Sequence, residues 1–104
     1  MVKPIIFAPA ARQEVNAAAR RYGEERSELR FEFHAAIKEA LERMVQLSRH
    51  LGTPPLVDPE RAIKRVFVER FPFSVYFIEL PTRFRVLAVA HGRRMPFYWR
   101  DRVK

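Results

Sequence analysis

The sequence predicts a single α+β domain over residues 1–104, with an N-terminal strand and a helical hairpin packed on a small antiparallel sheet. Two observations predict it. Apolar residues recur every three to four positions in the first half, which indicates amphipathic helices, whereas the second half consists of β-branched and aromatic runs typical of strands. A chain of 104 residues can bury one hydrophobic core but has no room for a second domain.

The first half is expected to form one strand and two helices. The apolar run at residues 5–7 predicts a short strand. Alanine-rich sequence from about residue 10 to 22 predicts a first helix, with Gly23 as its stop. A second helix is expected over residues 27–51, where a sustained apolar stripe marks one face and Gly52 ends it.

The second half supplies the sheet that the helical hairpin covers. Strands are expected at residues 62–70, 73–80 and 83–91, and their short connections require antiparallel hairpins. The last two strands are apolar on both faces, so a second layer is needed on the side away from the helices, and a partner chain could supply it. Residues 52–59 are expected to form a flexible loop, and residues 97–99 an aromatic tail.

Several classes of protein are excluded by what the sequence lacks. It has no cysteine, which excludes disulfides, thiolate metal sites and thiol nucleophiles, and fits a cytoplasmic protein. No apolar run is long enough for a membrane helix, and the N-terminal run is too short for a secretory signal. His34, His50 and His91 lack the spacing of a helical zinc site, and no glycine-rich phosphate loop is present. We therefore expect no metal, no small-molecule cofactor and no membrane contact.

The charge is strongly uneven along the chain. Twenty Lys and Arg against twelve Asp and Glu give a net charge of +8. Residues 1–60 hold nine basic and nine acidic side chains, whereas residues 61–104 hold eleven basic and three acidic ones. Such asymmetry favours an anionic partner, either nucleic acid or an acidic polypeptide. A solvated arginine-rich surface is the alternative interpretation.

The candidate functional residues are the basic and aromatic side chains of this second half: Lys64, Arg65, Arg70, His91, Arg93, Arg94, Tyr98, Trp99, Arg100 and Arg102. Arginine can bind phosphate through two hydrogen bonds, and Tyr or Trp can stack on bases. A metal-independent nuclease could use such a set, with Tyr98 or His91 transferring protons. The structural alternative is that His91 ends a strand and that Tyr98 and Trp99 pack against the edge of the core.

Three stretches together carry a family resemblance. They are Phe-Ala-Pro-Ala-Ala at residues 7–11, Arg-Phe-Pro-Phe-Ser-Val-Tyr-Phe at residues 70–77, and Val-Leu-Ala-Val-Ala-His-Gly-Arg-Arg at residues 86–94 with Pro96, Tyr98 and Trp99 after it. In combination they resemble the RelE/ParE toxin superfamily of bacterial type II toxin–antitoxin systems. The resemblance spans nearly the whole chain and implies a RelE/ParE-like β-α-α-β-β-β fold.

The superfamily has two branches with different targets. The RelE-like branch consists of ribosome-dependent ribonucleases that cut mRNA, and resemblance to it would imply the catalytic set Arg65, His91, Arg93 and Tyr98. Ser74, however, occupies the position where those enzymes usually carry an arginine. The Phe-Pro-Phe sequence at residues 71–73 instead resembles the ParE-like branch, which poisons DNA gyrase and has no established hydrolytic chemistry. The ParE-like branch is favoured, and it implies a target-binding set of Lys64, Arg65, Arg70, Arg93, Arg94, Trp99, Arg100 and Arg102.

Both branches imply the same kind of partner. A cognate antitoxin with an acidic, amphipathic C-terminal segment is expected to fold on binding and to pack across the sheet or the helical hairpin. The cellular target is then DNA gyrase or the ribosome with mRNA. A non-toxic, basic nucleic-acid-binding module is a further alternative; it explains the charge of the second half but not the closing motif. An inactive homologue of such toxins is another.

Overall fold

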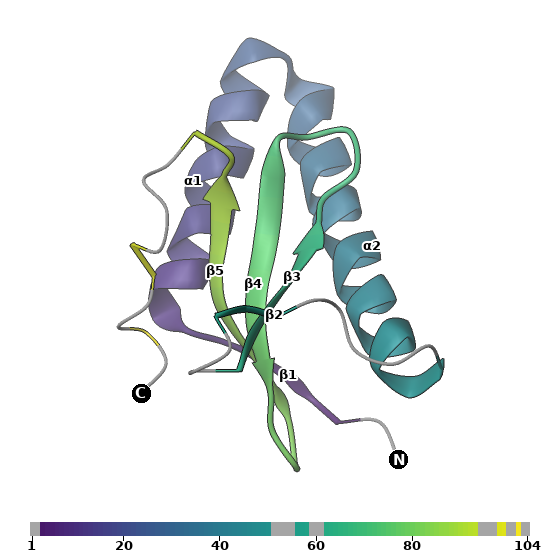
Figure 1. Cartoon of the computed structure of the whole chain (residues 1–104). Coiled ribbons are helices and arrows are strands. Elements are labelled where there is room, and N and C mark those ends of the chain that lie inside the picture. Colours follow the sequence, from purple (N-terminus) through teal and green to yellow (C-terminus); the bar gives the residue numbers. More distant parts are fainter. Residues whose placement is uncertain (1–2, 51–55, 59–61, 94–97, 100–101, 103–104) are drawn as a thin grey trace.

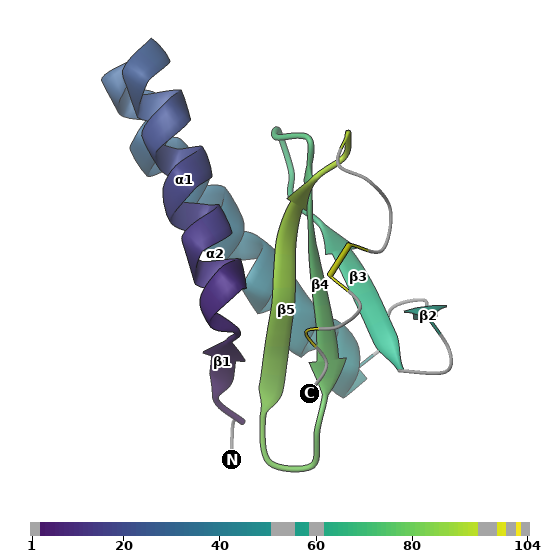
Figure 2. The same ribbon diagram turned by 90° about the vertical axis from the view of Figure 1, so that its left-hand side faces the viewer.

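The computed structural model describes residues 3–50, 56–58, 62–93, 98, 99 and 102. Two layers make up the fold: a helical hairpin lies across one face of a five-stranded sheet (Figure 1). Figure 2 shows the two layers from the side. The elements are β1 (Ile5–Phe7), α1 (Pro9–Glu25), α2 (Ser27–His50), β2 (Leu56–Asp58), β3 (Ile63–Phe67), β4 (Phe73–Glu79) and β5 (Phe84–His91). The α+β class is confirmed. Among the described residues, no helix is long and apolar enough to cross a membrane.

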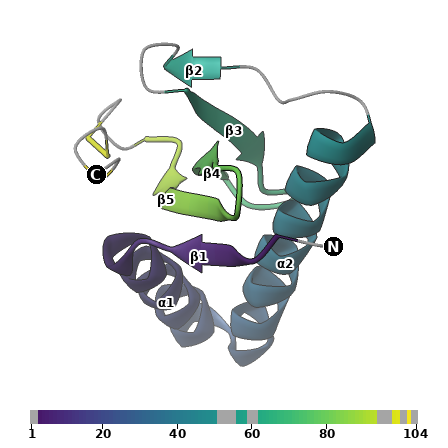
Figure 3. The ribbon, with the colours of Figure 1, turned by 90° about the horizontal axis from the view of Figure 1, so that it is seen from below.

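The strand order across the sheet is β1-β5-β4-β3-β2. The predicted antiparallel hairpins are confirmed, because β3 pairs with β4 and β4 pairs with β5 in antiparallel fashion. β1 differs: it joins the sheet parallel to β5, with Ile5 opposite Phe84 (Figure 3). Both helices and three strands separate β1 from β5 along the chain, so no tight turn fixes their relative direction.

Three predicted boundaries are wrong. The expected loop at residues 52–59 contains β2, which pairs with β3 in antiparallel fashion; residues 52–55 and 59 lie outside the described part. α1 also continues past Gly23 to Glu25. A Cβ atom at Gly23 would lie 3.0 Å from Nε of Arg30, so the side chain of Arg30 on α2 occupies the space beside this glycine.

The predicted strand over residues 62–70 is shorter in the structure, because β3 ends at Phe67. The Val68 N–H still donates to the Phe73 carbonyl at 2.9 Å, which begins the turn into β4. Arg70 in this turn has a φ of 71°, a left-handed conformation that cannot continue a strand.

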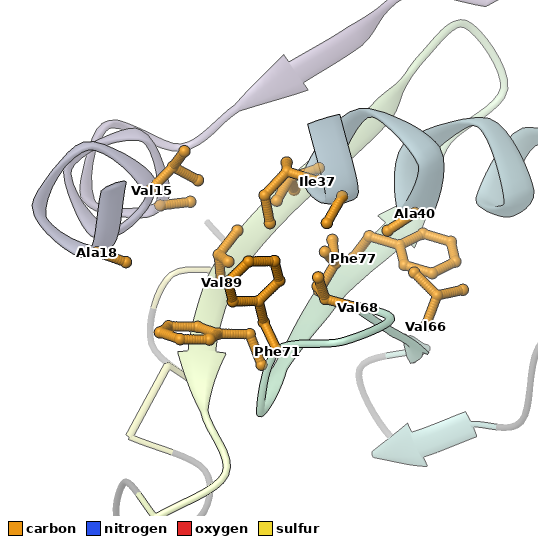
Figure 4. Packing of buried hydrophobic residues seen from close by; sticks show 14 of the residues in the cluster. Val15, Ala18, Ile37, Ala40, Val66, Val68, Phe71, Phe77 and Val89 are labelled. Atoms are coloured by element: carbon orange, nitrogen blue, oxygen red, sulfur yellow. The ribbon is translucent and has the colours of Figure 1, made fainter. Parts of the chain in front are cut away.

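The main core lies between the helices and the sheet (Figure 4). The apolar stripe predicted for the second helix is confirmed, since Phe33, Ile37 and Ala40 are buried there. They pack against side chains such as Phe77 and Val89 on the near face of β4 and β5. The central strands are buried on their other face too, as their composition predicted.

The second apolar face is covered in part by the chain's own C-terminal segment. Trp99 is only 2% exposed and belongs to a small cluster that includes Ile63, Ile78 and Leu87. Its ring stacks on Tyr76 with 4.3 Å between the ring centroids. The chain itself therefore supplies part of the second layer that covers the sheet on the side away from the helices.

Candidate functional site

A pocket of about 310 Å³ lies between α1, the end of β5 and Tyr98. Three of the four candidates for a RelE-like active site meet there, namely His91, Arg93 and Tyr98. The other lining residues come from α1 and from the two central strands: Glu14, Ala17, Arg21, Phe73 and Val89. The pocket thus combines an apolar floor with basic and acidic groups.

The position of the pocket follows from the short length of β1. β1 pairs with β5 only as far as Val86, so the edge of β5 beyond Val86 needs other hydrogen-bond partners. The register between β4 and β5 shifts by one residue after Tyr76, and this irregularity places Leu87 and Val89 at that edge. The Val89 N–H donates to Oε1 of Glu14 at 3.0 Å, and the Leu87 carbonyl accepts from Nη1 of Arg102 at 3.2 Å.

Glu14 is the central acceptor of this network. Its side chain is 15% exposed. Oε1 accepts from the Val89 N–H and from Nη1 of Arg102, both at 3.0 Å, while Oε2 accepts from the Tyr98 hydroxyl. The carboxylate therefore ties the C-terminal segment to α1 and β5, and its charge is offset by Arg102 within the protein.

The turn after β5 positions the basic side of the pocket. The Gly92 N–H donates to the Pro72 carbonyl at 2.8 Å, and the Arg93 N–H donates to Nδ1 of His91 at 3.0 Å. The His91 ring also lies edge-on to Phe73, with 5.2 Å between the ring centroids. In the neutral imidazole this hydrogen bond leaves the proton on Nε2. Arg93 itself is exposed.

Sequence reasoning missed Glu14 and Arg21. Both lie on α1, in the half of the sequence whose charges balance, and neither belongs to the motifs of the second half. The available signal was spacing: Glu14 lies three residues after Ala11 and four before Ala18, both buried, so it borders the apolar face of the helix.

Other candidates lie elsewhere. Arg65 is on β3, which β4 separates from β5, and its guanidinium lies 4.6 Å from the ring centroid of Phe67. Phe67 is 62% exposed, so this pair forms a basic and aromatic patch of its own. The four residues of the RelE-like set are therefore not brought together.

Lys64 takes part in an internal ion-pair cluster. Its side chain is 12% exposed, and Nζ lies 3.6 Å from Oε1 of Glu79. Glu79 also accepts from Lys3 at 2.7 Å and from the Ser48 hydroxyl at 2.9 Å. The hydrogen bond from Lys3 is the main cause that lowers the pKa of Glu79 below its ordinary value. A structural role accounts for Lys64, which is poorly placed to contact a target.

The remaining predicted binding residues divide into four groups. Arg70 is exposed and forms an ion pair of 2.5 Å with Glu32. Trp99 is only 2% exposed, the buried position that the structural alternative expects, and its role as a contact residue stays a prediction. Arg102 is committed to Glu14, and Arg94 and Arg100 lie outside the described residues. Within the described part of the chain, no three His, Asp or Glu side chains form a group suited to a metal ion.

No protein-family model and no curated relative matches the sequence. A solved structure does match: a chain of the "Chromosomal ParDE TA system from P. aeruginosa" superimposes with a TM-score of 0.61 at 16% identity. The match covers 86% of this chain and 96% of that chain, so it includes both the helical hairpin and the sheet. The RelE/ParE-like fold predicted from the sequence is thereby confirmed, and the chain has the fold of a component of a ParDE toxin–antitoxin system.

Proposed function

We propose that the protein is the toxin of a type II toxin–antitoxin system, that it inhibits DNA gyrase in the manner of ParE-like toxins, and that a cognate antitoxin neutralises it. The observation that carries the proposal is the match of the whole fold to a chain of a ParDE system, with 96% of that chain covered. The sequence motifs at residues 70–77 and 86–94 support the same assignment independently of the fold.

The chemistry of the pocket favours a binding role over hydrolysis. The Tyr98 hydroxyl donates a hydrogen bond to the Glu14 carboxylate, so the phenol already has an acceptor within the protein. Arg65 lies on β3 and does not line the pocket, and Ser74 is buried on β4 in place of the arginine of RelE-like enzymes. A ribonuclease would need these groups to converge on one phosphate.

The exposed cations are the proposed contacts with the target. Arg70 and Arg93 are exposed, and Arg65 presents its guanidinium beside the exposed ring of Phe67. We assign the antitoxin's acidic, amphipathic segment to the Arg65–Phe67 patch, because it joins an unburied aromatic ring to positive charge.

The test is a DNA gyrase supercoiling and cleavage assay with the purified protein free of antitoxin. Inhibition that leaves cleaved DNA trapped on gyrase is the expected result. Arg93→Ala is expected to weaken inhibition, whereas Arg20→Ala on the exposed face of α1 removes the same charge and should not. No inhibition at any concentration, with both variants and the parent folded, would refute the gyrase assignment.

The RelE-like alternative keeps one observation in its favour, since His91, Arg93 and Tyr98 line the same pocket. Its test is mRNA cleavage on programmed ribosomes. Cleavage that is lost in Tyr98→Phe, in a protein with no effect on gyrase, would establish this alternative. Salt-sensitive nucleic-acid binding without growth arrest would instead favour the non-toxic binding module.

A further inference from the structure

Phe31 is the most exposed large apolar side chain in the described part of the chain, with 72% of its surface accessible. It lies on α2, on the side of the helix opposite the stripe that Phe33 and Ile37 bury. A single exposed apolar residue is common on protein surfaces and by itself indicates no partner. The neighbours of Phe31 on this face of the helix decide which partner fits it.

The exposed face of α2 carries residues at the spacing of a helix-pairing seam. Four exposed residues follow one another at spacings of three, four and three positions and so form one row along the helix: Glu28, Phe31, Ala35 and Lys38. α2 borders the molecule on one side (Figure 1). A second helix can therefore lie lengthwise along this row.

The row is complementary to itself when a second copy of α2 runs antiparallel to it. If Phe31 of one copy faces Ala35 of the other, two-fold symmetry makes the reverse contact as well, so a large ring packs on a small residue at two places. The same register places Glu28 opposite Lys38, again twice, and each apolar pair is then flanked by an ion pair. A parallel pairing would place equal charges opposite one another.

The overall charge favours the same face. A net charge of +8 makes most contacts between two copies repulsive. The row on α2 is an exception, because its charged residues are Lys38 and the exposed carboxylates of Glu28 and Glu42, which extends the row by four positions. We propose that a second copy of this chain docks on this face, through an antiparallel, two-fold contact of α2 with α2.

Glu28 is available for this contact. In the single chain it lies 3.6 Å from Nε of Arg26, but the side chains of Glu28 and Arg26 are 67% and 62% exposed, so water weakens their attraction. The interface depends on one aromatic ring from each copy, and small interfaces bind weakly. We expect half of the chains to be dimeric at on the order of 100 μM. The pairing requires neither an antitoxin nor gyrase, so it stands apart from the toxin assignment.

The test is sedimentation equilibrium of the 104-residue chain, free of antitoxin, at concentrations up to about 1 mM. The parent is expected to pass from monomer to dimer over this range. Phe31→Gln is expected to weaken self-association about tenfold, because it removes the ring that packs on Ala35. Ile6→Gln removes another exposed apolar side chain, on β1, and is expected to change it less than about twofold.

The charges test the register. Lys38→Glu places carboxylates opposite one another at both ends of the contact and is expected to weaken self-association about tenfold. Arg20→Glu, on the exposed face of α1, changes the net charge by the same amount and is expected to have less than about a twofold effect. The double variant Glu28→Lys with Lys38→Glu exchanges the two charges and restores both ion pairs, so it should associate like the parent. A parallel pairing predicts no such recovery.

A parent chain that stays monomeric up to about 1 mM would overturn the proposal. Dimerisation that Phe31→Gln leaves unchanged would do so too, because the interface would then lie elsewhere, and so would a double variant no better than Lys38→Glu. A monomeric parent whose antitoxin binding is lost in Phe31→Gln would assign the face to the antitoxin instead. Circular dichroism checks that each variant is folded, and the concentration dependence of the parent tests the proposal without any variant.

Discussion

The hydrogen bonds to the Glu14 carboxylate join α1, β5 and the C-terminal segment, and Glu14→Ala removes all of them. Three donors depend on this group: the Val89 N–H at 3.0 Å, Nη1 of Arg102 at 3.0 Å and the Tyr98 hydroxyl. The alanine variant leaves the Val89 N–H without its acceptor at the edge of β5. It also removes the ionic partner of Arg102, whose side chain is 23% exposed.

The expected loss follows from these three contacts. An unsatisfied N–H in a largely buried position costs about 1–3 kcal/mol. The ion pair adds no more than about 1 kcal/mol, because both partners keep some contact with water. We therefore expect Glu14→Ala to lower the free energy of unfolding by about 1–4 kcal/mol. Glu14→Gln keeps an acceptor for the Val89 N–H but loses the charge and the acceptor of the Tyr98 hydroxyl, so its expected cost is about 1–2 kcal/mol.

The assay is urea unfolding followed by two probes. Circular dichroism reports the global transition, and the fluorescence of Trp99, the single tryptophan of the chain, reports the C-terminal segment. Tyr98 and Arg102 flank Trp99 and both bind Glu14, so the tryptophan should become exposed in Glu14→Ala before the core unfolds. A variant with unchanged stability and an unshifted emission maximum would refute the role assigned to Glu14.

Three further outcomes are expected. The pKa of Glu79 is lowered below its ordinary value of 4.5, chiefly by the hydrogen bond from Lys3. The ionised Glu79 carboxylate therefore stabilises the folded state above that value, and this stabilisation is lost as the pH falls through the lowered pKa. Glu79→Gln should therefore cost about 1 kcal/mol at pH 7 and nothing once the carboxyl of the parent is protonated, a difference that urea unfolding at several pH values measures. Gly23→Ala should raise the melting temperature, because alanine favours the helix by about 0.5–1 kcal/mol and the atom it meets belongs to the flexible side chain of Arg30; a lower melting temperature would show that Arg30 cannot move. Phe67→Ala should change stability by less than about 0.5 kcal/mol, since the ring is mostly exposed, yet weaken antitoxin binding in a titration; unchanged affinity would remove the patch from the interface.

The spacing of apolar residues predicted the helices and strands because the formation of each element depends mainly on the residues within it. The apolar spacing of residues 27–51 and the β-branched runs at 73–80 and 83–91 correspond to α2, β4 and β5 within a few residues. The prediction was wrong at Gly23, because a glycine can either end a helix or lie within one. A glycine ends many helices, but here it lies inside α1, where the side chain of Arg30 occupies the space beside it.

The candidate site was predicted only in part. His91, Arg93 and Tyr98 come from one continuous stretch, so the sequence placed them near each other, and the structure brings them to one pocket. Trp99 from the same stretch does not line the pocket and is buried instead, as the structural alternative expects. A tryptophan at the end of a basic segment can either stack on a base or pack in a hydrophobic core. Here it is buried because its ring stacks on Tyr76 of β4, a contact that the local sequence does not show.

The helices, the strands, the concentration of positive charge in the second half and the motifs that resemble those of a toxin family can all be read from the sequence, because each is a property of neighbouring residues. The packed fold was needed to learn that β1 lies parallel to β5 and that Glu14 binds a strand 75 residues further along the chain. It also brings Arg21 and Arg93 to the same pocket. These contacts escape local pattern because a charged residue at the border of a helix has no local partner, and its partner depends on which strand edge the packed helix meets.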